Sequence, residues 1–156
     1  MRGPAAAAAL LLATAVASCS AHGTGSPRGA GRSGPHLAVT GAYVPEPPMA
    51  DMAAGYFTIA NTGRASDQLT AVTSDLAASV TLHSTTPTGA MKKEPTLPVP
   101  AGGRLALRIG GDHLMLMGLK RKPRVGDTVT FVLRFAASPP ITVKAPVKPA
   151  TYRPGQ

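Results

Sequence analysis

Residues 128–135 read Thr-Val-Thr-Phe-Val-Leu-Arg-Phe, and this stretch decides the fold class. From Val129 onward every second side chain is a large apolar one, while Thr130 and Arg134 fall on the other parity. A period of two is typical of a strand with one face in the core. Further short β-prone runs are expected at 37–43, 55–60, 68–73, 79–84, 104–109, 113–118 and 141–147, with this one extending over 127–135.

Glycine, proline and asparagine clusters separate these runs and predict the turns. They fall at 61–63, 100–103, 110–112, 126–127 and 138–140. No stretch keeps a period of 3.6 residues, so no helix is expected. About eight strands joined by such turns indicate an all-β fold, an antiparallel β-sandwich or barrel built as a single domain.

The N-terminal residues predict export and a lipid anchor. Arg2 precedes an apolar run over 5–17, which is shorter than the ~20 residues that span a bilayer. The run ends in Val16-Ala17-Ser18-Cys19, which resembles a bacterial lipobox. We therefore expect a lipoprotein signal peptide over 1–18 and lipidation at Cys19, the alternative being an incidental cysteine in an ordinary signal. Two acyl chains are generally enough for stable anchoring.

Composition divides the remaining chain. Residues 19–35 follow the cleavage point with glycine, serine, proline and arginine, and predict a flexible linker. The folded domain is expected over 36–148, and a loose, disordered tail over 149–156. Cys19 is the only cysteine, so no disulfide can form within the chain.

The formal net charge is +9, or +8 without Arg2. A basic protein can bind nucleic acid, but aromatic residues make up only 4% and no recognition motif is present. The expected location outside the cytoplasm also argues against a nucleic-acid partner. Adhesion to anionic lipid or cell-wall polymer is the simpler interpretation of the charge.

The stretch 113–117, His-Leu-Met-Leu-Met, carries the clearest functional signal. In a strand, Leu114 and Leu116 share one face, and His113, Met115 and Met117 share the other. A soft thioether suits Cu(I), and imidazole suits copper in either oxidation state. The alternative is a strand buried on both faces, in which the methionines fill gaps.

His83 and Met91 form the second candidate group. Val80 and Leu82 are expected to point inward, which leaves His83 on the opposite face. Met91 lies in the polar loop expected after this strand. Alone, either residue would more often be an ordinary surface side chain, but a sandwich could bring them to the group at 113–117.

Three other features have weaker signals. Met49 and Met52 could form an accessory thioether site or be flexible surface residues. Met117 could ligate with Met115 or pack. A basic run could dock an acidic partner near a metal or be a solvated turn; it comprises Lys120, Arg121, Lys122 and Arg124.

The order His83, Met91, His113-x-Met115 resembles the motif of the periplasmic copper chaperone family called PCu(A)C. Its pattern is His, ten residues, Met, about twenty-one residues, His-x-Met. Here 21 residues lie between Met91 and His113, but only seven lie between His83 and Met91. Further matching stretches lie at 41–45, 54–63, 100–103, 110–120 and 126–129. The resemblance spans roughly residues 37–147.

This resemblance implies a cupredoxin-like sandwich that binds Cu(I) through His83, Met91, His113 and Met115. The shortened loop leaves open whether Met91 reaches the metal. The residue types independently favour a Cu(I) site. The domain has no cysteine, which a blue-copper centre needs. A catalytic zinc site would normally use three His, Asp, Glu or Cys ligands. Neutral thioether ligands favour exchange of the ion.

We therefore expect a monomeric copper chaperone, not an enzyme, anchored on the outer face of the bacterial cytoplasmic membrane. The sequence shows no catalytic triad, acid–base carboxylate pair or nucleotide loop. The resemblance implies cytochrome c oxidase subunit II, through its dinuclear copper site, or a thiol-bearing assembly factor as the acceptor. The alternatives are a copper-sequestering tolerance lipoprotein and a structural surface lipoprotein without metal.

Overall fold

The computed structural model describes residues 33–155, and every regular element in that range is a strand. The predicted signal peptide and Cys19 lie outside the described residues. Between 33 and 155 there is no helix long and apolar enough to cross a membrane. The strands are β1 (Leu37–Pro45), β2 (Met52–Asn61), β3 (Asp67–Ser74), β4 (Ala77–Thr85), β5 (Met91–Glu94), β6 (Leu97–Val99), β7 (Arg104–Ala106), β8 (His113–Leu119), β9 (Thr128–Phe135) and β10 (Ile141–Lys148).

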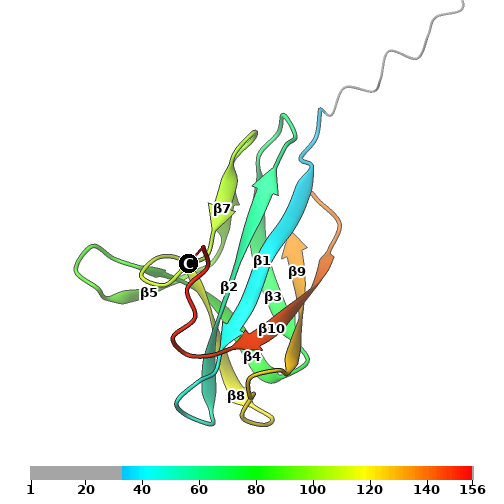
Figure 1. The fold of residues 1–156 in the computed structure, drawn as a ribbon. Coiled ribbons are helices and arrows are strands. Elements are labelled where there is room, and N and C mark those ends of the chain that lie inside the picture. The colour runs from blue at the N-terminus through cyan, green and yellow to red at the C-terminus, as the bar shows by residue number, and fades with distance from the viewer. Residues whose placement is uncertain (1–32, 156) are drawn as a thin grey trace, which may run out of the picture.

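One continuous sheet folds over to make both layers of the sandwich (Figure 1). Its strand order is β5-β4-β8-β2-β1-β10-β9-β3-β6, with β7 paired to β2. Neighbours are antiparallel except β1 and β10, which run parallel. The two layers meet closely at Gly55 of β2, where an added Cβ would lie 3.1 Å from Cζ of Phe131 in β9. The fold is the expected all-β, cupredoxin-like sandwich.

The alternation at 128–135 is confirmed, since Val129, Phe131 and Leu133 are all buried. They meet apolar side chains of the facing layer, among them Phe57 of β2 and Leu114 and Leu116 of β8. Burial of such side chains stabilises the fold by roughly 1.5–3 kcal/mol each. Because Leu114 and Leu116 are held in this core, the other face of β8 is fixed on the outside of the sandwich.

Two strands were not expected, β5 and β6. The sequence gives little strand signal for either, because β5 is mostly charged and β6 is only three residues long and contains Pro98. They form at opposite edges of the sheet, where β5 pairs with β4 and β6 pairs with β3. Met91 therefore begins a strand, where the sequence predicted a loop.

The C-terminal segment after β10 has no strand in its described part, but one of its side chains contacts the sheet. Tyr152, in the segment predicted to be loose, packs edge-on against Tyr43 with ring centroids 5.0 Å apart. Tyr43 in turn lies 5.2 Å from Tyr56 of β2. Tyr152 is thus packed on the outer face of the sheet, because two buried tyrosines there offer an aromatic surface to a third.

Candidate metal site

The pairing of β4 with β8 brings the two domain histidines of interest together. His83 lies directly opposite His113, and Leu82 lies opposite Leu114. Paired residues in an antiparallel ladder share a face, and the faces alternate along each strand. The leucines are held in the core, so both histidines point to the outer face.

The two imidazole rings lie at a separation suited to one shared ion. Their centroids are 5.6 Å apart, and the ring planes are inclined by 31°. A nitrogen bound to a metal at about 2 Å puts the centroid of its ring roughly 3 Å from the metal. Two ligating rings would then have centroids about 5–6 Å apart, which matches His83 and His113.

His113 is buried, and a backbone carbonyl orients its ring. Nδ1 of His113 lies 3.0 Å from the carbonyl oxygen of Gly111, which can only accept a hydrogen bond. Nδ1 therefore carries the proton, and Nε2 keeps a free lone pair. Nε2 is buried and has no hydrogen-bond partner. The Thr85 hydroxyl donates to the same carbonyl at 3.1 Å and ties this turn to β4.

In His83 the roles of the two ring nitrogens are exchanged relative to His113. Its Nε2 lies 3.0 Å from the Thr81 hydroxyl, and its buried Nδ1 has no partner. When Nε2 donates to Thr81, the lone pair is on Nδ1. Burial lowers the pKa of His83, and the neighbouring His113 and Lys93 lower it further. The ring is thereby kept neutral, which is the form that binds metals.

The thioethers lie on the same outer face at different depths. Met115 follows His113 by two positions and pairs with Thr81 of β4 and Ala54 of β2. It is half-buried, whereas Met91 on the edge strand is 64% exposed. Met91 pairs with Thr85, and its neighbour Lys93 pairs with His83. His83, His113 and Met115 thus form the centre of the candidate site, with Met91 at its rim.

The hairpin that carries Met91 is braced by polar contacts. The Ser84 hydroxyl donates to the Glu94 carboxylate at 2.7 Å, and Lys92 forms an ion pair with the same carboxylate at 3.3 Å. These contacts lower the pKa of Glu94, the Ser84 bond being the larger cause. In Figure 1 the β4–β5 hairpin extends from the body of the sandwich. Met91 therefore lies on a hairpin that projects from the sandwich and is held in place by these polar contacts.

The other candidate methionines lie farther along the same face. Met52 of β2 pairs with Met117 of β8, which is 46% exposed. Met49 lies in the loop between β1 and β2 and is also exposed. None of the three is placed at the histidine pair.

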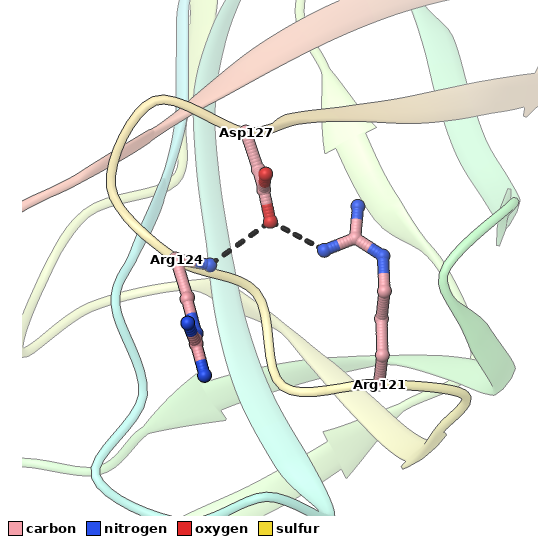
Figure 2. A network of polar contacts seen from close by, with 3 residues as sticks. All are labelled: Arg121, Arg124 and Asp127. Atoms are coloured by element: carbon pink, nitrogen blue, oxygen red, sulfur yellow. Dashed lines mark hydrogen bonds and ion pairs between the residues drawn. The ribbon is translucent and has the colours of Figure 1, made fainter.

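The basic run is distant from the histidines, which corrects the expectation that it lies near the metal. It begins after Leu119, about 20 Å from His113 at ~3.3 Å per residue. Figure 2 shows the Asp127 carboxylate bound by the Arg121 guanidinium and by the backbone N–H of Arg124. These bonds, that from Arg121 first, lower the pKa of Asp127. Much of the run stabilises the β8–β9 turn.

Sequence reasoning missed the residues that orient the histidines, namely Thr81, Thr85 and Gly111. Their contacts depend on the register between β4 and β8, and on a turn that folds back on β8. Across residues 33–155, no three His, Cys, Asp or Glu side chains gather into a metal-binding group. The side chains that the candidate site offers to a metal are two imidazoles and the neighbouring thioethers.

The sandwich is similar to solved PCuAC domains. The copper-bound PCuAC domain from PmoF2 is 22% identical, with a TM-score of 0.64, covering 72% of this chain and 92% of that domain. The copper(I) form of DR1885 from Deinococcus radiodurans, solved in solution, is 38% identical, with a TM-score of 0.61. That match covers 71% of this chain and 77% of DR1885. The fold is thus that of a PCuAC-type domain.

Sequence relatives identify the family. The chain is 33% identical over 150 residues to "Putative lipoprotein Lxx21020" of Leifsonia xyli subsp. xyli (strain CTCB07), a match over 89% of this chain and 90% of the relative. Residues 37–147 match the family described as "Putative lipoprotein LpqE-like". The chain belongs to this LpqE-like family.

Proposed function

We propose that this protein is an extracytoplasmic Cu(I) chaperone that accepts the ion at His83 and His113 and passes it to another protein. The observation that carries the proposal is the pair of buried nitrogens without partners, Nδ1 of His83 and Nε2 of His113. A buried polar atom without a partner costs about 1–3 kcal/mol. Two such atoms on facing rings are explained by an ion that both can bind.

The neighbouring thioethers favour Cu(I) as that ion. Met115 lies on the same face two residues from His113, and Met91 stands at the rim. Thioether sulfur is a soft ligand that selects Cu(I), whereas harder ions prefer oxygen. The similarity to the copper-bound PmoF2 domain and to copper(I)-bound DR1885 supports the same choice.

Ligand depth predicts the order of transfer. Met91 is the most exposed of the four proposed ligands, and His113 is the most buried. An incoming acceptor would reach the ion first from the Met91 side, and His83, His113 and Met115 would hold it until new bonds form. The chain would thus transfer its cargo by stepwise ligand exchange and would not act as an enzyme.

The proposed setting is the outer face of the cytoplasmic membrane, where a diacylated Cys19 would anchor the protein. The match to a family described as lipoproteins supports this location. The proposed acceptor is cytochrome c oxidase subunit II, at its dinuclear copper site, or a thiol-bearing assembly factor.

The test is a Cu(I) titration of residues 33–156 against a competing chelator, in the parent and in the His83→Ala plus His113→Ala variant. We expect stoichiometric binding in the parent and its loss in the double variant, with both proteins folded by circular dichroism. Equal binding in the two proteins, or none in either, would remove the histidine pair as the site.

A second measurement separates a chaperone from a sequestering protein. The copper-loaded protein is mixed with a copper-free acceptor domain, and transfer is followed over time. Transfer within seconds is expected for a chaperone. Retention of the ion at equilibrium would instead indicate sequestration.

A further inference from the structure

Three methionines line one cavity on the outer face of the sheet, and one of them, Met115, lies two residues from His113 on β8. Met49 comes from the β1–β2 loop, Met52 from the start of β2 and Met115 from β8. The cavity has a volume of about 340 Å³. Its remaining wall is mostly apolar, with Tyr56 and Ile109 among the lining residues, and it also contains two charged residues, Glu46 and Arg153.

The strand register explains how two of these thioethers approach each other. Ala54 pairs with Met115, and Met52 pairs with Met117. Met52 and Met115 are therefore diagonal neighbours on one face of adjacent strands, within reach of long side chains. Ala54 adds little bulk between them, and the cavity remains open there. Met117 stands outside the cavity lining, so the accessory group is Met49 and Met52 with Met115.

We propose that Met49, Met52 and Met115 form a second, thioether-only site for Cu(I), contiguous with the histidine site through Met115. This inference uses the Cu(I) chemistry of the proposed function, but two of its three ligands are different. Core methionines usually fill space, whereas these three border space that is left open. Soft sulfur donors in an apolar, partly open cavity suit a soft monovalent cation.

Two features make this site weaker than the histidine site. Met115 is shared, so an ion at the histidines competes for the same sulfur. Arg153 lies in the cavity wall, and its Nη1 donates to the carbonyl oxygens of Ala150 at 3.3 Å and Tyr152 at 2.9 Å. The guanidinium charge repels a cation in the cavity, and the Glu46 carboxylate in the same wall offsets part of this repulsion. Because the weaker site shares Met115 with the stronger one, it would hold copper briefly before the ion moves to the histidines.

The test uses the full chain, produced without lipid and kept in detergent, with Cys19→Ser so that an unacylated thiol does not compete for copper. Cu(I) is titrated against a chelator, while the methionine ε-methyl signals are followed by NMR. We expect a second, weaker equivalent whose binding shifts the methyl signals of Met49 and Met52. The Met49→Leu plus Met52→Leu variant should lose this equivalent and keep the first.

Two further variants sharpen the result. Met117→Leu, outside the cavity, should keep both equivalents, and Arg153→Gln should bind the second several-fold more tightly. No shift of the Met49 and Met52 methyl signals with excess Cu(I), or equal loss in Met117→Leu, would overturn the proposal.

The histidine double variant separates this proposal from the proposed function. In the His83→Ala plus His113→Ala variant, added Cu(I) should still shift the methyl signals of Met49 and Met52. If those signals shift while the parent shows no binding at the histidines, the proposed function fails and the methionine site stands. If Cu(I) binds only at the histidines, the proposed function stands and the methionine site is refuted.

Discussion

At the scale of single residues, the candidate site depends on how each imidazole is held. His113 is oriented by the Gly111 carbonyl and His83 by the Thr81 hydroxyl, and each ring keeps one buried nitrogen without a partner. A second partner that fixes the tautomer of a ligating histidine is a common feature of metal sites. The thioethers differ instead in exposure, which makes their contributions separable by mutation.

Met91→Leu should weaken Cu(I) binding by less than about ten-fold, or 1.4 kcal/mol, and should speed release to a chelator. The reason is that Met91 lies at the solvent-exposed rim. Met115→Leu should cost more affinity, because Met115 is half-buried beside His113. Leucine keeps the side-chain volume close to that of methionine. Stopped-flow transfer measures both, and rates in both variants equal to the parent would refute the proposed order.

At the scale of strands, Asp67 joins the start of β3 to the loop after β9. The carboxylate is buried and accepts hydrogen bonds from the backbone N–H groups of Gln68, Ala137 and Ser138, at 2.8, 2.9 and 3.0 Å. Burial alone would raise the pKa of Asp67, but the hydrogen bond from the Ser138 side chain and then these backbone bonds together outweigh burial, and the net pKa is lowered. The charged form is therefore favoured in the folded protein.

Asp67→Asn should lower the free energy of unfolding by about 2 kcal/mol at pH 7, since the amide presents N–H to backbone donors. A carboxylate with a lowered folded pKa contributes its full stabilisation above the unfolded pKa of about 4. This contribution is lost as the pH falls through the folded value. The difference between parent and variant should thus shrink below about pH 4. Midpoints of urea unfolding at pH 7 and pH 3 measure the stability difference between the parent and Asp67→Asn. The control is Asp51→Asn, because Asp51 is exposed.

Tyr152→Ala should destabilise the fold by about 1 kcal/mol, the typical contribution of an aromatic pair beyond its area. The loss follows from the contact of Tyr152 with Tyr43 and from Lys148, whose Nζ lies 5.5 Å from the Tyr152 ring centroid. Thermal unfolding measures the change. Thr151→Ala, which is exposed, is the matched control, and equal melting of Tyr152→Ala and the parent would show that the tail does not hold the sheet.

At the scale of the whole molecule, the lysines nearest the histidines lie on β5, and the basic run lies beyond the far end of β8. Lys93 pairs with His83, and Lys92 is well exposed on the same hairpin. Lys122 instead donates to the carbonyl of Pro48 at 3.1 Å. The β4–β5 hairpin therefore places positive charge beside the candidate site, and we expect an anionic acceptor to be steered there.

Lys92→Gln plus Lys93→Gln should slow Cu(I) transfer to an anionic chelator by roughly two- to ten-fold at low ionic strength. Transfer to a neutral chelator should change little, and added salt should remove the difference because it screens the charges. Arg134→Gln plus Lys144→Gln removes the same charge from exposed positions on β9 and β10. An equal slowing in that control would indicate an effect of net charge alone.

The sequence by itself determined the fold class and the faces of individual strands. The alternation at 128–135 placed Val129, Phe131 and Leu133 in the core, because strand periodicity is a local property. The order His83, Met91, His113-x-Met115 likewise pointed to Cu(I) through residue type and resemblance. These inferences needed no knowledge of which strands are neighbours.

Only the tertiary structure decided which side chains meet. The register between β4 and β8 set His83 against His113, and the pairing of β2 with β8 brought Met52 beside Met115. Strand pairing joins segments that are far apart in the chain, so local sequence does not specify it. For the same reason the basic run, adjacent to β8 in sequence, lies far from the histidines, and Met91 proved to begin an edge strand.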